Sequence, residues 1–215
     1  LYASSRNGRE ERMKDQYFGD VNDYLKYGIL RELKKNAGAL HVVWMLTPSD
    51  GSTDGKFTDY LEKPETWRDY DPLLFDLLKS EVVVRRRRAV EHVESWEGLP
   101  SSFTSGIVPD DRPGRQKWSA EMLEAIPNDS LAFFDPDNGI EVPSCPLGRK
   151  RSSKYVYWNE LAAAWDRGAS LLVYQHFTRE NREQFLERLS LDFKRKLGAQ
   201  QVMVLRTARV AFLLV

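Results

Sequence analysis

The sequence predicts an α/β fold in which helices cover both faces of a mainly parallel sheet. Two observations support this prediction. Buried strands, which are short runs apolar on both faces, alternate along the chain with amphipathic helices. The chain then closes with two apolar runs, 201–205 and 210–215, whose connection is too short for a parallel crossover. We therefore expect a doubly wound, mainly parallel sheet with a C-terminal antiparallel hairpin.

Length and composition fit one globular domain. The chain has 215 residues, of which 41% are hydrophobic, and Lys+Arg and Asp+Glu both number 32, so net charge does not favour a uniformly basic nucleic-acid binder. Residues 1–12 are polar, and we expect a leader outside the fold there and a single α/β domain over 13–215. The single cysteine, Cys145, excludes an internal disulfide. No apolar run reaches the roughly 18 residues of a membrane span, and we expect a cytoplasmic protein.

Helices are predicted where apolar residues recur at spacings of three and four. The first begins at a cap formed by Asp20 or Asn22, and its apolar stripe is Leu25, Ile29, Leu30 and Leu33. A second helix opens at Pro72, and a third follows the arginine run 85–88 as far as about Trp96. The remaining helices end at Pro127, end near Gly168, and span 181–196.

Buried strands are predicted at 40–46, 130–134 and 170–174, with a short strand near 103–108. The first of these is followed by a polar, glycine-containing loop at 47–55. A strand followed by a loop of small residues is how many nucleotide and cofactor sites begin. We therefore expect this loop to approach a cofactor through Thr47, Ser49, Asp50 and Gly51.

An acidic stretch follows the 130–134 strand. Asp135, Asp137 and Asn138 lie where the strand leaves the sheet, with Pro136 between the two carboxylates. In open α/β sheets, ligands bind at this carboxyl edge, and three oxygen-bearing side chains exceed what one turn requires. The same side chains could instead form an Asx turn and cap a helix. We take Asp135, Asp137 and Asn138 as candidate catalytic residues.

Two further segments are candidates for substrate contact. The basic run 149–151 follows the acidic stretch and precedes Tyr155, and arginine with interleaved aromatics is typical of stacking and phosphate contact. We therefore expect Arg149, Arg151 and Tyr155 to bind substrate. His176 follows a buried strand that should parallel the 130–134 strand, so it could reach the same edge. A structural histidine is the alternative.

Short motifs in this order resemble the bacterial enzymes that methylate an adenine N6 of 23S ribosomal RNA, which belong to the Rossmann-like S-adenosylmethionine-dependent methyltransferases. Gly19, Asp23, Leu25 and Lys26 are similar to that family's opening helix motif, and residues 131–136 resemble the strand ending in its D-P-P-Y motif. The resemblance implies Rossmann-like methyltransferase topology. It also implies S-adenosylmethionine as cofactor, with Gly19 and Asp23 near it, and RNA or DNA as partner.

The resemblance further assigns roles to single residues. Lys26 matches a lysine that lines the active site, and Asp135 matches an aspartate that accepts a hydrogen bond from the target amino group. The chain departs from the family at Asp137 and Asn138, which stand where D-P-P-Y has proline and the aromatic residue that stacks on the base. It departs again at 45–47, where the family has an acidic residue before a glycine-rich loop.

Three interpretations of function remain open, and methyl transfer to an amino nitrogen of a nucleobase is favoured. The second is a nuclease or phosphohydrolase, in which Asp135, Asp137 and Glu141 hold Mg or Mn and Lys154 stabilises a phosphate. The third is a methyltransferase-like protein that has lost its chemistry and serves as a partner subunit.

Overall fold

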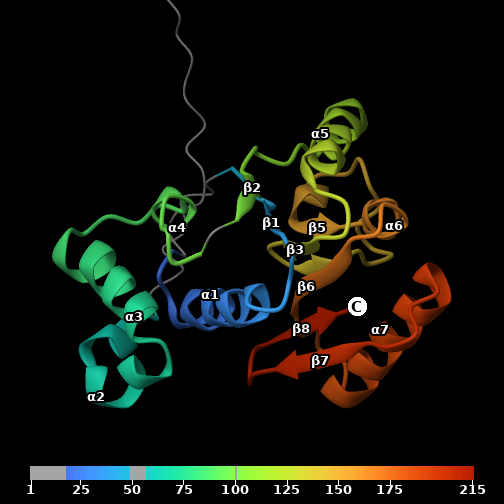
Figure 1. Ribbon diagram of the computed structural model, residues 1–215. Helices are drawn as coiled ribbons and strands as arrows, with labels where there is room; N and C mark the ends of the chain where they lie inside the picture. Colours follow the sequence, from blue (N-terminus) through green and yellow to red (C-terminus); the bar gives the residue numbers. More distant parts are fainter. Residues whose placement is uncertain (1–17, 49–56, 100) are drawn as a thin grey trace, which may run out of the picture.

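A computed structural model describes residues 18–48, 57–99 and 101–215 of the chain. Its centre is a six-stranded sheet with the strand order β2-β1-β3-β6-β8-β7 (Figure 1). The strands of this sheet are β1 (Leu40–Trp44), β2 (Ser102–Thr104), β3 (Leu131–Asp135), β6 (Ser170–His176), β7 (Met203–Arg206) and β8 (Val210–Leu214).

The first four strands of this order run parallel, and the closing hairpin adds the antiparallel part. The pairs β1–β2, β1–β3 and β3–β6 are parallel, whereas β8 runs antiparallel to both β6 and β7. The expected mainly parallel sheet with one reversed strand in a C-terminal hairpin is thus confirmed. From β1 the chain passes to β2 on one side, and β3 lies on the other side. The carboxyl ends of β1 and β3 therefore form a topological switch point.

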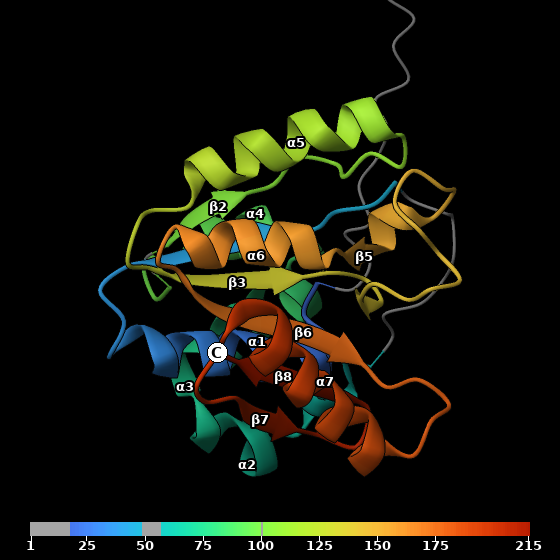
Figure 2. The ribbon, with the colours of Figure 1, turned by 90° about the vertical axis from the view of Figure 1, so that its right-hand side faces the viewer.

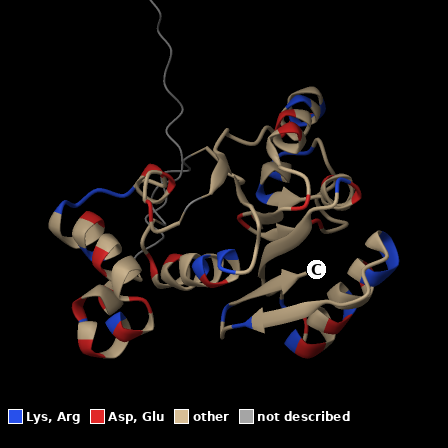
Figure 3. Ribbon diagram, viewed as in Figure 1, with Lys and Arg blue, Asp and Glu red and all other residues tan. Residues whose placement is uncertain are grey.

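Seven α-helices surround the sheet within the described residues. They are α1 (Val21–Lys34), α2 (Pro64–Trp67), α3 (Pro72–Leu78), α4 (Glu91–Glu94), α5 (Arg112–Ala125), α6 (Trp158–Asp166) and α7 (Arg182–Leu197). Figures 1 and 2 show α1 and α3 on one side of the sheet and α5 and α6 on the other. Figure 3 shows the charged residues mainly on the helices and loops, with the strands of the sheet largely uncharged.

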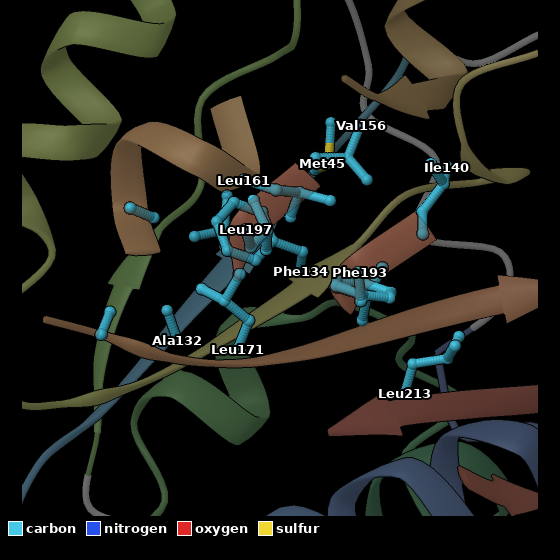
Figure 4. Close-up of a cluster of buried hydrophobic side chains, with 14 of the residues drawn as sticks. Met45, Ala132, Phe134, Ile140, Val156, Leu161, Leu171, Phe193, Leu197 and Leu213 are labelled. Carbon is cyan, nitrogen blue, oxygen red and sulfur yellow. The ribbon is translucent and has the colours of Figure 1, made fainter. Parts of the chain in front are cut away.

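The sheet buries apolar side chains on both of its faces, as doubly wound sheets do. Successive strand residues alternate between two cores: Phe134 packs with α5, α6 and α7, and Phe133 packs with α1, α3 and α4. The first core contains Trp118, Leu161 and Phe193 from those three helices (Figure 4 labels Leu161 and Phe193). Burial on both faces explains why the strands appear in the sequence as continuous apolar runs.

Helix α1 begins as expected, but it buries a different face from the one its leucines predict. Asp20 is its N-cap, and one carboxylate oxygen accepts hydrogen bonds from two backbone N–H groups, those of Asn22 and Asp23. Three residues of the predicted stripe, Leu25, Ile29 and Leu33, are only half-buried. The residues buried instead are Asp23, Tyr24, Lys26, Tyr27 and Leu30. The helix turns a partly charged face inward because that face carries a buried ion pair.

The helix predicted from the arginine run to about Trp96 is much shorter in the structure, where only α4 forms. Helix α3 continues as a π-helical segment, Lys79–Val84, and helix resumes only in the single turn of α4. The buried Glu81 carboxylate pairs with Arg85 at 2.5 Å and Arg87 at 2.8 Å, which draws the chain into a turn. Arg86 has a positive φ of 54°, which no helix continues through. These side-chain contacts override the local helical pattern.

The region expected to be one long loop after Glu141 is enclosed by a small pair of strands that the sequence did not predict. β4 (Gly139–Ile140) and β5 (Tyr155–Val156) pair in parallel. The pairing continues beyond β4, where the N–H of Glu141 donates to the carbonyl of Val156 at 2.9 Å. Within the described residues, no helix is long and apolar enough to cross a membrane. The leader expected at 1–12 lies outside the described residues.

Candidate functional site

A cavity of about 890 Å³ opens at the carboxyl edge of the sheet, where β1 and β3 end. The two strands meet there because Trp44, the last residue of β1, is the register partner of Asp135, the last residue of β3. The cavity lies on the α1 side of the sheet. It is lined by Phe18, Asp20, Asn22, Asp23, Lys26, Tyr27, Trp44, Met45, Leu46, Thr47, Phe57, Val90, Asp135, Pro136, Asp137, Asn138, Lys154, Tyr174, His176 and Arg209.

A buried lysine joins α1 to the acidic stretch. The Lys26 ammonium donates to Asp23 at 3.0 Å and to Asp135 at 2.7 Å, and all three side chains are largely buried. The ammonium also lies 4.8 Å from the centre of the Tyr174 ring. Lys26 and Asp23 fall on the same face of α1 because they are three residues apart. The structure thus brings Lys26 and Asp135, both candidate catalytic residues, into direct contact.

The two carboxylates of this ion-pair cluster have different surroundings. Asp23 also accepts hydrogen bonds from the Gly19 N–H at 3.1 Å and the Tyr27 hydroxyl at 3.2 Å. For Asp135, the Lys26 ammonium is its one side-chain hydrogen-bond donor within the described chain. Asp23 is thereby fixed in place, whereas Asp135 retains accepting capacity toward the cavity that it lines.

These surroundings shift the pKa values of the charged groups. Burial raises the pKa of Asp135 to about 6, although Lys26 opposes that rise. Burial and the neighbouring Asp23 carboxylate raise the pKa of Asp20 to about 6 as well. Burial alone would lower the pKa of Lys26, but Asp135 and Asp23 together hold it above its ordinary value. At neutral pH the cluster therefore contains an ionised lysine and an Asp135 that titrates near the working range.

A second set of contacts holds Asp137 against the end of β1. Its Oδ2 accepts a hydrogen bond from the Thr47 hydroxyl at 2.9 Å and lies 3.4 Å from the Lys154 ammonium. Asp137 thus links the end of β1 to the loop that follows the acidic stretch. Thr47 and Asp137 were predicted separately, one for cofactor and one for catalysis, and the structure brings them into direct contact.

The turn after β3 is held by Gln175, which the sequence did not single out. Its side-chain oxygen accepts from the N–H of Ile140 at 2.8 Å, and its Nε2 donates to the carbonyl of Asn138 at 3.3 Å. Gly139 lies between these two residues with φ of 105°, and a Cβ there would come 2.2 Å from Gln175 Nε2. A glycine is therefore required at this close approach. Asn138 also lines the cavity.

Several residues predicted to bind substrate do not line this cavity. Arg149 and Arg151 are exposed, and the backbone N–H of Arg151 donates to Asp110 Oδ2 at 2.8 Å. Tyr155 lies in the β4–β5 pair, and its carbonyl accepts a hydrogen bond from the buried Arg115. Of the predicted substrate contacts, His176 alone lines the cavity. Within this segment Lys154 does line the cavity, whereas the basic run 149–151 precedes β5 and lies outside it.

The carboxylates proposed for a metal do not converge. Glu141 does not line the cavity, and its Oε1 accepts from the backbone N–H of Trp158 at 3.0 Å. Lys26 occupies the position beside Asp135 that a cation would need. Among the described residues, no group of three or more His, Cys, Asp or Glu side chains is placed to hold a metal ion.

Four other residues were predicted to bind the cofactor, and one of them lies within the described residues. Gly19 has φ of 76° and supports the site through its N–H, since it contacts Asp23 without lining the cavity. Ser49, Asp50 and Gly51 lie outside the described residues.

The sequence did not predict that aromatic side chains and a further cation line the cavity. Trp44 ends β1 and Tyr174 lies two residues before the end of β6, and both line the cavity. The parallel register that sets Phe134 beside Val173 also places the next residue, Tyr174, beside Asp135. Arg209 reaches the same edge because the reversed strand β8 begins where the parallel strands end. No local motif predicts that these three residues line the cavity; the order and direction of the strands do.

Comparisons of the chain with protein-family models, with curated proteins and with solved structures found no match. The site is therefore interpreted from its own geometry.

Proposed function

We propose that the protein is an S-adenosylmethionine-dependent methyltransferase that acts on an amino nitrogen of a nucleobase in nucleic acid. The observation that carries the proposal is a single cavity that reaches both Thr47, at the end of β1, and Asp135, at the end of β3. Its volume of about 890 Å³ is within the range of cofactor and small-molecule sites. Its position at the switch point of the sheet is where such ligands bind in open α/β folds.

The strand arrangement supports the same proposal. The order β2-β1-β3-β6-β8-β7, in which only β8 is reversed, is consistent with the Rossmann-like methyltransferase topology that the sequence resemblance implies. In this arrangement Asp135-Pro136 occupies the sheet edge next to β1, as the resemblance to the D-P-P-Y strand requires.

The chemical character of the cavity fits this cofactor. Four carboxylates line it, those of Asp20, Asp23, Asp135 and Asp137, against the three cations Lys26, Lys154 and Arg209. This balance suits a ligand with a sulfonium and an ammonium group better than a polyphosphate. Aromatic side chains on the same walls, including Tyr27 and Trp44, suit a purine ring. The donor set and the volume therefore fit the cofactor, which supplies an electrophilic methyl group when it is bound.

The residues of the chain then act on the acceptor amine. Asp135 would accept a hydrogen bond from the amine N–H and so align the nitrogen lone pair. It would receive the amine proton as the C–N bond forms and the methyl–sulfur bond breaks, with S-adenosylhomocysteine as the leaving group. Lys26 keeps Asp135 ionised against the cost of burial and fixes its orientation. Since the pKa of Asp135 is about 6, methyl transfer should fall as the pH drops below that value.

The metal-dependent alternative has less support. The chain places a lysine beside Asp135 and turns Glu141 away from the cavity. A hydrolase of this kind needs several converging oxygen ligands around a divalent cation.

Transfer of a radiolabelled methyl group from S-adenosylmethionine to unmodified transcribed RNA, with single-stranded DNA in parallel, tests the proposal. We expect labelled nucleic acid with the wild-type protein at pH 8 and a loss of about 100-fold or more for Asp135→Asn. Asp76→Asn is the control, because Asp76 forms an exposed ion pair with Arg68 far from the cavity lining. If the folded wild-type protein binds the cofactor but labels no nucleic acid, the assignment of the acceptor is wrong.

A further inference from the structure

Phe57 and Arg209 form a stacked pair where the cavity opens to solvent. Both residues line the cavity, and the Arg209 guanidinium lies 4.2 Å from the centre of the Phe57 ring. Phe57 remains 51% exposed, which is unusual for a phenylalanine, and Arg209 is exposed as well. Together they present an aromatic face and a planar cation at the entrance of the cavity.

The fold brings these two residues together from opposite sides of the site. The carbonyl of Phe57 accepts from the N–H of Val21 at 3.0 Å, which holds Phe57 beside the start of α1. Arg209 belongs to the β7–β8 turn, where its N–H donates to the Thr207 hydroxyl at 3.1 Å. The pair therefore bridges the first helix and the last hairpin across the cavity entrance.

The order of strands along the edge assigns this pair to one part of the cavity. Asp135 ends β3, with Trp44 of β1 on one side and β6 on the other. The start of β8 follows β6, since His176 is the register partner of Val210. A cofactor at the β1–β3 switch point leaves the part bounded by Tyr174, His176 and Arg209 for the acceptor. The Phe57–Arg209 pair closes that part.

Within the described part of the chain, no carboxylate lies within ion-pair distance of the Arg209 guanidinium. Another arginine on a phenylalanine, Arg188 on Phe185 at 5.3 Å, is instead neutralised by Glu180 at 2.7 Å. A guanidinium that lies on an aromatic ring without a counter-charge can both stack on a base and contact the adjacent phosphate.

We propose that Phe57 and Arg209 form a stacking platform that receives one base of single-stranded nucleic acid and presents its amino group to Asp135. This inference rests on the proposed function and specifies how its acceptor is held. Phe57 supplies the aromatic face that the sequence lacks at Asn138, where the related methyltransferases have an aromatic residue. Arg209 contacts the phosphate next to that base, and the unstacked strand needs no prior base flipping.

Fluorescence anisotropy with a labelled single-stranded 12-mer, as RNA and as DNA, tests the platform, with the corresponding duplex as comparison. Phe57→Leu keeps an apolar side chain but removes the ring, and we expect single-strand affinity to fall about 10- to 100-fold. Phe57→Trp should restore it. Arg209→Ala should weaken binding and its salt dependence, whereas Arg188→Ala should match the wild type. Thermal unfolding followed by circular dichroism verifies that each variant folds.

The result separates this inference from the proposed function. If single-strand affinity is unchanged in Phe57→Leu, or if wild-type protein binds neither oligonucleotide, the platform is refuted, while calorimetric binding of S-adenosylhomocysteine can still hold. If the duplex binds as tightly as the single strand and loses as much in Phe57→Leu, the platform is also refuted. Ring-dependent binding of the single strand without binding of S-adenosylhomocysteine supports the platform and rejects the methyltransferase proposal.

Discussion

At the scale of single residues, the buried Asp135 carboxylate is held at a cost to stability. Its pKa in the folded protein is about 6, above the ordinary value of 3.8, even with the Lys26 ammonium at 2.7 Å. The folded state therefore keeps a proton that the unfolded state has lost between about pH 4 and pH 6. The contribution of Asp135 to stability therefore falls through that window as the pH rises, and the loss persists above it. A residue kept in such a state is a candidate for function rather than for folding.

This reasoning predicts that Asp135→Asn stabilises the protein at pH 8 by about 1–3 kcal/mol, since one pKa unit corresponds to about 1.4 kcal/mol. Urea unfolding of the variant and the wild type from pH 4 to pH 8 measures the difference. The two stabilities should converge near pH 4. Asp20, whose pKa is also about 6, contributes equally to both proteins, so the difference isolates Asp135. A variant that is less stable than the wild type at pH 8 would show that the carboxylate is structural.

At the scale of elements, the start of α1 depends on a glycine, because any larger residue at that position would clash with a neighbouring segment. Gly19 has φ of 76°, and a Cβ there would come 2.5 Å from Val82 Cγ2 in the π-helical segment. Its N–H donates to Asp23, so this conformation also orients a carboxylate of the buried cluster. The glycine that leads into the opening helix motif therefore has a physical reason in this chain.

We expect Gly19→Ala to destabilise the protein by about 1–3 kcal/mol, through strain at positive φ and the clash with Val82. Gly28→Ala is the matched control, because Gly28 lies inside α1 and a Cβ there meets nothing within 4 Å. It should stabilise the protein by about 0.5–1 kcal/mol. Chemical denaturation measures both changes. Equal effects of the same sign at the two positions would contradict this account of the helix start.

Much of the secondary structure could be predicted from the sequence, because strands buried on both faces leave long apolar runs and helices carry their caps. The N-cap at Asp20 and the final hairpin are examples. The turn after Val84 could not be predicted, since the sequence does not show that Arg85 and Arg87 both pair with a buried Glu81 carboxylate. The inward face of α1 was missed for a related reason. A buried lysine is recognisable only when its partner, Asp135, is known to lie beside it.

At the scale of the whole molecule, the site is assembled from segments that only the topology brings together. Thr47 follows β1, Asp135 ends β3, and Arg209 precedes the reversed strand β8, yet all three line one cavity. The sequence predicts the first two as site residues because each follows a buried strand. It does not predict Arg209, because only the structure shows that β8, rather than β7, pairs with β6 and begins at this edge.

The central claim is that this cavity binds S-adenosylmethionine, and calorimetric titration with S-adenosylhomocysteine tests it most directly. We expect saturable binding to the wild type and a loss of at least about 10-fold in Leu46→Trp, because Leu46 lines the cavity and an indole there takes up ligand space. Leu191→Trp, which places the same indole at an exposed position of α7, should bind as the wild type does. Absence of binding heat with folded wild-type protein, or equal binding by Leu46→Trp, would contradict the claim.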